Sequence, residues 1–182
     1  MSADEPRLRA ARQLGDYLAQ AQLRLVLAES CTAGNVAGTL AIIPGISAWL
    51  CGSFVVYRNE SKAQWLHIPQ DLLDDPSIGP VSPQVTALLA NQALSATREA
   101  DVAVAVTGHI GPNSPIELDG RVFFGLKRRG NSTVDSYTQQ LESPAPRDRH
   151  DYLARQRRLI ECTCWVITQT LETLRASDPP TV

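Results

Sequence analysis

The chain has no uninterrupted run of about 18 apolar residues, the length that a membrane-spanning helix needs. It also lacks a basic surplus, because 17 lysines and arginines face 19 acidic residues. Proteins that bind nucleic acid through bulk charge need a concentrated excess of Lys and Arg. The first twenty residues interleave Asp, Glu and Arg and contain no apolar core of a signal peptide. We therefore expect a cytoplasmic protein that binds no membrane and has no nucleic-acid partner.

Residues that bind metals or form disulfides are also few. In the absence of a secretory signal, the four cysteines are expected to be reduced thiols. Cys162 and Cys164 are separated by a single residue, too close for the usual zinc-binding pair, and no second pair completes a site. The three histidines are scattered along the chain at His67, His109 and His150. We predict no metal site.

The residues that are present indicate one globular domain spanning residues 1–182. Apolar residues three or four apart predict a helix over 6–22, and a long final helix is expected over about 148–175. In the core between them, residues 23–142, apolar runs alternate with helical segments. The expected strands are 23–28, 48–57, 101–108, 120–129 and 132–142, and the expected helices are 32–43, 59–66 and 83–99, the last capped by Ser82. This order predicts a layered α/β domain with a mixed β-sheet.

Three polar segments stand at the ends of predicted strands, where ligands of α/β sheets gather. The first begins at Ser30, the second runs from Tyr57 to Lys62, and the third follows the strand that ends at Gly108. Each alone has a simpler explanation as a helix cap, a solvated surface or a turn.

Four stretches together are more specific. "LAESCTAG" (27–34), "IPGISAWLCGSFVVYRNESKAQWL" (43–66), "GPVSPQV" (79–85) and "DVAVAVTGHIGP" (101–112) resemble, in order and spacing, the C-terminal domain of the CinA competence/damage-inducible family. The resemblance spans about residues 8–126. It implies a single three-layer α/β/α domain and a homo-oligomer. It also implies an amidohydrolase that converts nicotinamide mononucleotide (NMN) and water to nicotinic acid mononucleotide and ammonia, without a metal or organic cofactor.

The resemblance also implies roles for individual residues. It places the family's nucleophile at Ser30, and its Tyr and Lys at Tyr57 and Lys62. An amide is a poor electrophile, so the serine needs a base, and Lys62 is the candidate if burial or a nearby cation lowers its pKa. Tyr57 is expected to relay a proton or to orient the lysine. The expected substrate-binding residues are Thr32, Asn59, Thr107, Gly108, Gly111 and, for the phosphate, Arg149.

Cys31 is the competing nucleophile. If Ser30 caps a helix that starts at Thr32, Cys31 shares a stripe with Gly34 and Gly38 and packs against the sheet as a small apolar group. A helix N-terminus lowers the pKa of a thiol, so a reactive cysteine stays the alternative. We predict that Ser30 is the reagent and that the amides beginning the helix are suited to an oxyanion or a phosphate.

Two segments depart from the family pattern. After Pro112 the chain reads "NSPIELDGRVFF", about two residues short of the family segment and without its extra glycines, and His109 is unusual at its position. Near the final helix, five arginines replace the usual Gly-Asp-Arg pattern, and a solvated helix face is their simpler explanation. The altered loop keeps an alternative function open, that of a catalytically silent homologue that binds a pyridine nucleotide or a partner protein. Nucleic-acid binding through the arginines is the weakest hypothesis.

Overall fold

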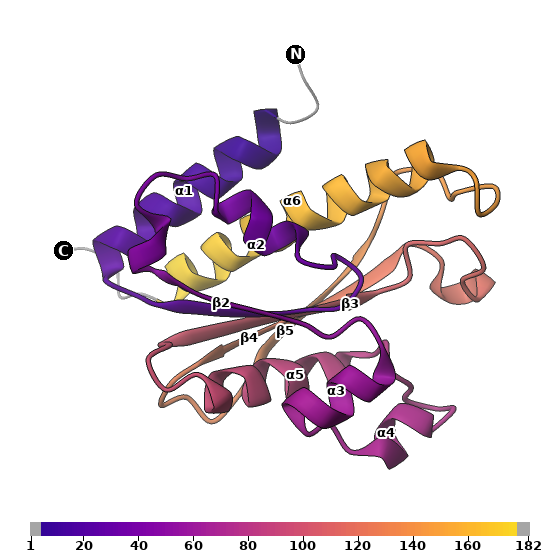
Figure 1. Ribbon diagram of the computed structural model, residues 1–182, viewed down its shortest axis with the longest axis horizontal. Helices are drawn as coiled ribbons and strands as arrows, with labels where there is room; N and C mark the ends of the chain where they lie inside the picture. The colour runs from indigo at the N-terminus through magenta and orange to yellow at the C-terminus, as the bar shows by residue number, and fades with distance from the viewer. Residues whose placement is uncertain (1–4, 178–182) are drawn as a thin grey trace.

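The computed structural model describes residues 5–177, and Figure 1 shows a β-sheet covered by helices on both faces. The elements are α1 (Glu5–Ala21), β1 (Leu25–Glu29), α2 (Asn35–Leu40), η1 (Ile46–Ala48), β2 (Leu50–Val55), α3 (Asn59–Leu66), α4 (Gln70–Asp74), α5 (Pro83–Ala96), β3 (Val102–Gly108), η2 (Ile116–Leu118), β4 (Arg121–Arg128), β5 (Asp135–Gln140) and α6 (Tyr152–Ala176). The predicted single α/β/α domain is confirmed.

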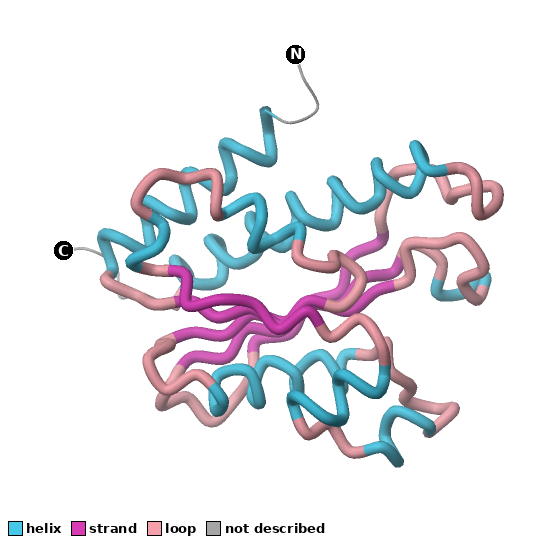
Figure 2. Tube along the Cα trace, in the orientation of Figure 1, coloured by secondary structure: helices cyan, strands magenta, loops and turns pink. Residues whose placement is uncertain are grey.

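The sheet is mixed, with strand order β2-β1-β3-β4-β5. The strands β2, β1 and β3 run parallel, and β4 and β5, which correspond to the two strands predicted over 120–129 and 132–142, form an antiparallel hairpin. At the end of β1, Glu29 pairs with Val55 of β2 and with Val106 of β3. The chain therefore leaves all three parallel strands at one edge of the sheet, on the right of Figure 2. This register brings the three polar segments together.

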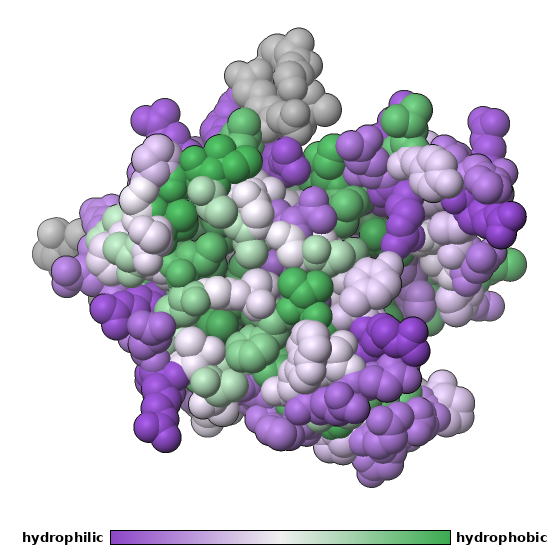
Figure 3. All heavy atoms as spheres, in the orientation of Figure 1, coloured by the Kyte–Doolittle hydropathy of each residue, from purple (hydrophilic) through white to green (hydrophobic). Residues whose placement is uncertain are grey.

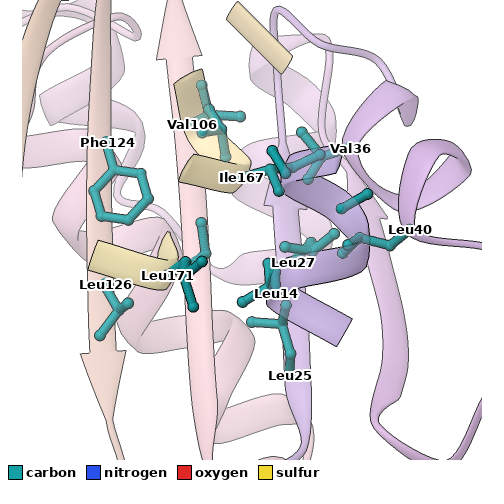
Figure 4. Close-up of a cluster of buried hydrophobic side chains, with 14 of the residues drawn as sticks. Leu14, Leu25, Leu27, Val36, Leu40, Val106, Phe124, Leu126, Ile167 and Leu171 are labelled. Atoms are coloured by element: carbon teal, nitrogen blue, oxygen red, sulfur yellow. The ribbon is translucent and has the colours of Figure 1, made fainter. Parts of the chain in front are cut away.

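Each face of the sheet packs against its own set of helices. Figure 1 shows α1, α2 and α6 on one face and α3, α4 and α5 on the other. In β1, Leu25 and Leu27 join the first core, drawn in Figure 4, whereas Val26 and Ala28 join the second. This alternation follows from the two-residue period of a strand. On the outside, Figure 3 shows apolar surface over α1 and α2, surrounded by hydrophilic side chains.

The main differences from the predicted elements lie in short helices. The predicted helix 32–43 is shortened to α2, because a turn with Ala33 and Gly34 at positive φ precedes it. The five-residue helix α4 was not predicted, and it buries Leu73. The final helix begins at Tyr152 rather than near residue 148. Ser82 caps α5 as expected, and its hydroxyl accepts a hydrogen bond from the Val85 amide.

Candidate active site

A pocket of about 300 Å³ lies where the three parallel strands end. Residues from all three predicted segments line it, together with the loop before α5 and one side chain of α6. Its lining residues are Ser30, Cys31, Tyr57, Asn59, Lys62, Pro80, Val81, Gly108, His109, Ile110, Gly111, Pro112, Asn113, Ser114 and Arg155. The structure therefore brings most of the predicted site residues together, but not Thr32, Thr107 or Arg149.

Glu29, to which no sequence motif assigned a role, fixes the turn that follows Ser30. It is the last residue of β1, it is 1% exposed, and its carboxylate accepts five hydrogen bonds of 2.8–3.0 Å. The donors are the Thr32 hydroxyl, the amides of Gly34, Val36 and Ala37, and the Ser53 hydroxyl. The carboxylate thus ties the start of α2 to the neighbouring strand β2.

This arrangement corrects two expectations about Ser30 and the helix behind it. The N-cap of α2 is Gly34, which makes no side-chain cap, so Ser30 is not a capping residue. The amides that begin α2 bind Glu29 and are therefore not free for an oxyanion or a phosphate. The physical reason is the intervening turn, because of which the helix begins at Asn35, five residues after Ser30. The sequence did carry a signal for the role of Glu29, because an acidic residue stands at the end of an otherwise apolar, buried strand.

Glu29→Gln is expected to destabilise the fold by about 2–4 kcal/mol. An amide group has one acceptor oxygen, so either orientation leaves at least two of the five donors without an acceptor. Chemical denaturation measures the change. The exposed Glu60→Gln, which removes a carboxylate paired with Arg58, is the control and should unfold like the wild type. A Glu29→Gln protein as stable as this control would contradict the role given to Glu29.

Ser30 and Cys31 occupy different surroundings in the turn after β1. The Ser30 amide donates to the Val106 carbonyl at 3.0 Å, and its own carbonyl accepts from Ala33, so its backbone is fixed from both sides. Cys31 is 6% exposed and belongs to the core cluster. A Cβ placed on Gly108 would lie 3.1 Å from the Cys31 sulfur. Cys31 thus packs against the core as predicted, although from a turn and not from a helical stripe, and it also lines the pocket.

Lys62 enters the pocket from α3, which spans the predicted residues. Its side chain is only 2% exposed, and this burial lowers the pKa of Lys62 below its usual 10.5, against an opposing effect of Cys31. One helical turn later, Leu66 is buried, whereas its neighbour Trp65 is 55% exposed. A lowered pKa increases the fraction of lysine that is neutral, and the neutral amine is the form that accepts a proton.

Tyr57 and Arg155 meet at the mouth of the pocket. The Tyr57 side chain is about half exposed, and its hydroxyl accepts a hydrogen bond of 2.9 Å from Arg155. Arg155 also donates to the carbonyl of Gly111, so this residue of α6 joins two walls of the pocket. Arg149, the predicted phosphate contact, is exposed and donates to the His150 ring instead. Because α6 begins only at Tyr152, Arg149 lies before the helix and Arg155 lies in its first turn.

The two threonines predicted to bind substrate do not line the pocket. Thr32 and Thr107 are both fully buried. The Thr107 hydroxyl lies 2.8 Å from that of Thr86, which donates to the Ser82 carbonyl at 2.7 Å. Thr86 has one hydroxyl proton, so Thr107 is the donor of the first bond. These contacts fix the end of β3 to the start of α5. The Thr32 hydroxyl is likewise engaged inside the protein, by its hydrogen bond to Glu29.

The charges on the lining are those of a site for an anion. Lys62 and Arg155 line the pocket, and among its described residues there is no carboxylate. His109 also lines it; burial lowers the pKa of His109, against an opposing effect of Asp119, so its ring is neutral at pH 7. Among residues 5–177 no group of three His, Cys, Asp or Glu side chains is arranged for a metal ion. In the same range, no helix combines the length and apolarity needed to span a membrane.

Comparison with known proteins gives one family. A CinA-like protein of Geobacter metallireducens is 40% identical over 117 residues, which are 63% of this chain and 28% of that protein. A putative competence-damage inducible protein of Clostridium kluyveri is 33% identical over 160 residues, 87% of this chain and 36% of the relative. The matched region thus spans about a third or less of these relatives.

Solved structures show the same fold. A competence/damage inducible protein from Agrobacterium tumefaciens has a TM-score of 0.78 and 29% identity over 94% of each chain. A competence damage-inducible protein from Klebsiella pneumoniae has a TM-score of 0.81 at 21% identity, over 94% of this chain and 99% of its own. The CinA C-terminal domain matches residues 8–156. This protein belongs to the CinA family, through the family's C-terminal domain.

Proposed function

We propose that the pocket is the active site of an amidohydrolase that converts NMN and water to nicotinic acid mononucleotide and ammonia. The observation that carries this proposal is that Ser30 lines the same small pocket as Lys62, a buried lysine with a lowered pKa. A serine hydroxyl is too weak an acid to react alone at neutral pH and needs an adjacent base. The lysine is the group suited to that role.

The residues support a two-step reaction. Neutral Lys62 accepts the Ser30 proton while the serine oxygen attacks the carboxamide carbon. The carbon–nitrogen bond then breaks, and the lysine returns the proton to the departing ammonia. In the second step water attacks the acyl-serine, and Lys62 takes one of the water's protons and returns it to Ser30 as the bond from the serine oxygen to the acyl carbon breaks. The carboxylic acid formed loses its remaining proton to solvent and leaves as the carboxylate. No step requires a metal.

The rest of the lining supports a nucleotide as the substrate. Arg155 supplies a cation near the mouth of the pocket, and its planar guanidinium suits a phosphate. The exposed ring of Tyr57 offers an aromatic surface beside it. The volume of about 300 Å³ is at the small end for ligand pockets, which favours a mononucleotide over a larger ligand.

Purified protein is expected to release one ammonia for each nicotinic acid mononucleotide formed from NMN. Nicotinamide riboside, which lacks the phosphate, should react less efficiently because Arg155 has no anion to bind. A coupled ammonia assay over pyridine nucleotides and unrelated amides, with the product identified by mass, is the measurement. If NMN binds but no amide releases ammonia, the protein is a catalytically silent homologue and this proposal is wrong.

A further inference from the structure

An ion pair between the buried Arg158 and the partly exposed Asp119 lies close to the Gly111 segment of the pocket lining. Arg158 of α6 is 4% exposed, and its two terminal nitrogens each lie 2.8 Å from an oxygen of Asp119, while its Nε donates to the Ser143 carbonyl. Hydrogen bonding by Arg158, and a weaker bond from Ser114, lower the pKa of Asp119, so its carboxylate stays charged at neutral pH. Burying two charges carries a desolvation penalty that does not by itself favour folding. The position of the pair suggests a second role.

The pair is linked to the mouth of the pocket through the loop that begins at Gly111. A Cβ on Gly111 would lie 3.5 Å from Arg158, and the Gly111 amide donates a bond of 3.1 Å to the Ser114 hydroxyl, which contributes to the lowered pKa of Asp119. The Gly111 carbonyl in turn accepts from Arg155, whose other terminal nitrogen donates to the Tyr57 hydroxyl. The loop from Gly111 to Ser114 thus lies between two arginines that are three residues apart on α6. Arg155 contacts it from the side of the pocket, and Arg158 contacts it from the side of Asp119.

The backbone at both ends of the segment from Gly111 to Gly120 packs too closely to admit a side chain. A Cβ on Gly111 would lie 2.8 Å from Pro146, and one on Gly120 would lie 2.7 Å from Gln140 and 3.3 Å from Arg158. Both glycines have positive φ, which other residues adopt only with strain. The backbone at Gly111 and Gly120 therefore packs directly against Arg158, which together with Asp119 forms a clamp. This is the segment in which the chain departs from the family pattern.

We propose that Asp119 and Arg158 are positioning residues, which fix the Gly111 loop and through it aim the Arg155 guanidinium at the anionic group of the substrate. The inference rests on the proposed function for the identity of that anion, a nucleotide phosphate. Neither residue is among those that line the pocket, so their effect on the ligand is indirect. Loss of the clamp weakens ligand binding and leaves the Ser30 chemistry intact.

Asp119→Asn is therefore expected to raise both the KM and the calorimetric Kd for NMN about tenfold, with kcat changed less than about twofold. Nicotinamide riboside should be affected little, because it has no phosphate for Arg155. Asp119→Glu, which restores the charge, should recover part of the affinity. Asp16→Asn, which removes a carboxylate beside Arg12 on the exposed face of α1, is the matched control and should bind NMN like the wild type.

Ser114→Ala covers the case in which Asp119→Asn fails to fold, because it breaks the same path without leaving a buried charge unpaired. It should raise the Kd for NMN in the same direction. A double-mutant cycle then tests the route: in an Arg155→Met background, Asp119→Asn or Ser114→Ala should weaken NMN binding no further. Additive losses, equal losses for the riboside, or an unchanged Kd would overturn the inference. The Kd values are measured in the Ser30→Ala background, in which NMN binds without being hydrolysed, so absence of ammonia release from the wild type refutes the proposed function alone.

Discussion

Ser30→Ala is expected to lower the rate of NMN hydrolysis by at least about 10³-fold, since the proposed nucleophile is removed and the other hydroxyls of the lining, those of Tyr57 and Ser114, are hydrogen-bonded to Arg155 and to the Gly111 amide. The variant should fold normally. Because Gly34 and not Ser30 is the N-cap of α2, the stability loss should be smaller than the roughly 1 kcal/mol of a removed cap. Single-turnover ammonia release and thermal unfolding measure the two effects.

Cys31→Ala is the matched control for that experiment. The Cys31 sulfur packs beside Gly108 and in the core, so its loss should leave most of the activity and reduce stability modestly. NMN should bind both variants, which separates lost chemistry from lost binding. If Cys31→Ala were inactive and Ser30→Ala active, the two residues would have exchanged roles and the nucleophile would be the thiol.

The location of the site could be predicted because strand and loop signals are local. The run of Val and Ala from Val102 to Val106 identified an interior strand, and parallel strands place the residues that follow them at one edge. Ser30, Tyr57 and Lys62 each follow such a strand closely. Their meeting in one pocket therefore required no knowledge of tertiary contacts beyond the order of the strands.

The residues that hold the site in place could not be predicted in the same way. Glu29 draws its five donors from the turn after β1, from α2 and from β2, and sequence spacing does not show that these segments converge on one carboxylate. The choice of Arg155 over Arg149 depends on where α6 begins, and an error of a few residues changes which side chain faces the pocket. The Asp119–Arg158 pair joins residues 39 apart in sequence and has no local signature.

The burial of Lys62 has opposite effects on stability and on catalysis. Its pKa is lower in the folded protein than the usual 10.5, so between these two values the unfolded chain binds more protons. Stability therefore rises with pH across that window, and below it the folded protein carries the full penalty of a buried ammonium. Lys62→Met should remove that penalty and raise stability at pH 7 by on the order of 1 kcal/mol, while abolishing activity.

The pH dependence of hydrolysis should identify Lys62 as the base. In the wild type the single-turnover rate should rise with pH while the lysine loses its proton, and it should level off below 10.5 because burial lowers the pKa of Lys62. Lys62→Arg keeps the positive charge but does not deprotonate in this range, so turnover should be lost while NMN still binds. Any residual rate of Lys62→Met should lack the rise altogether.

The comparison of the two variants separates a base from a substrate-positioning charge. If Lys62 only attracted the anionic substrate, arginine would replace it and methionine would not, and the pH profile would keep its shape. If Lys62 is the base, both variants fail alike, although only the methionine protein gains stability, because the arginine still buries a cation. An arginine variant that turned over NMN at more than about a tenth of the wild-type rate would leave Tyr57 or a chain of waters as the base. Tyr57 is the weaker alternative, since it lies at the mouth of the pocket with its side chain about half exposed, whereas Lys62 is buried.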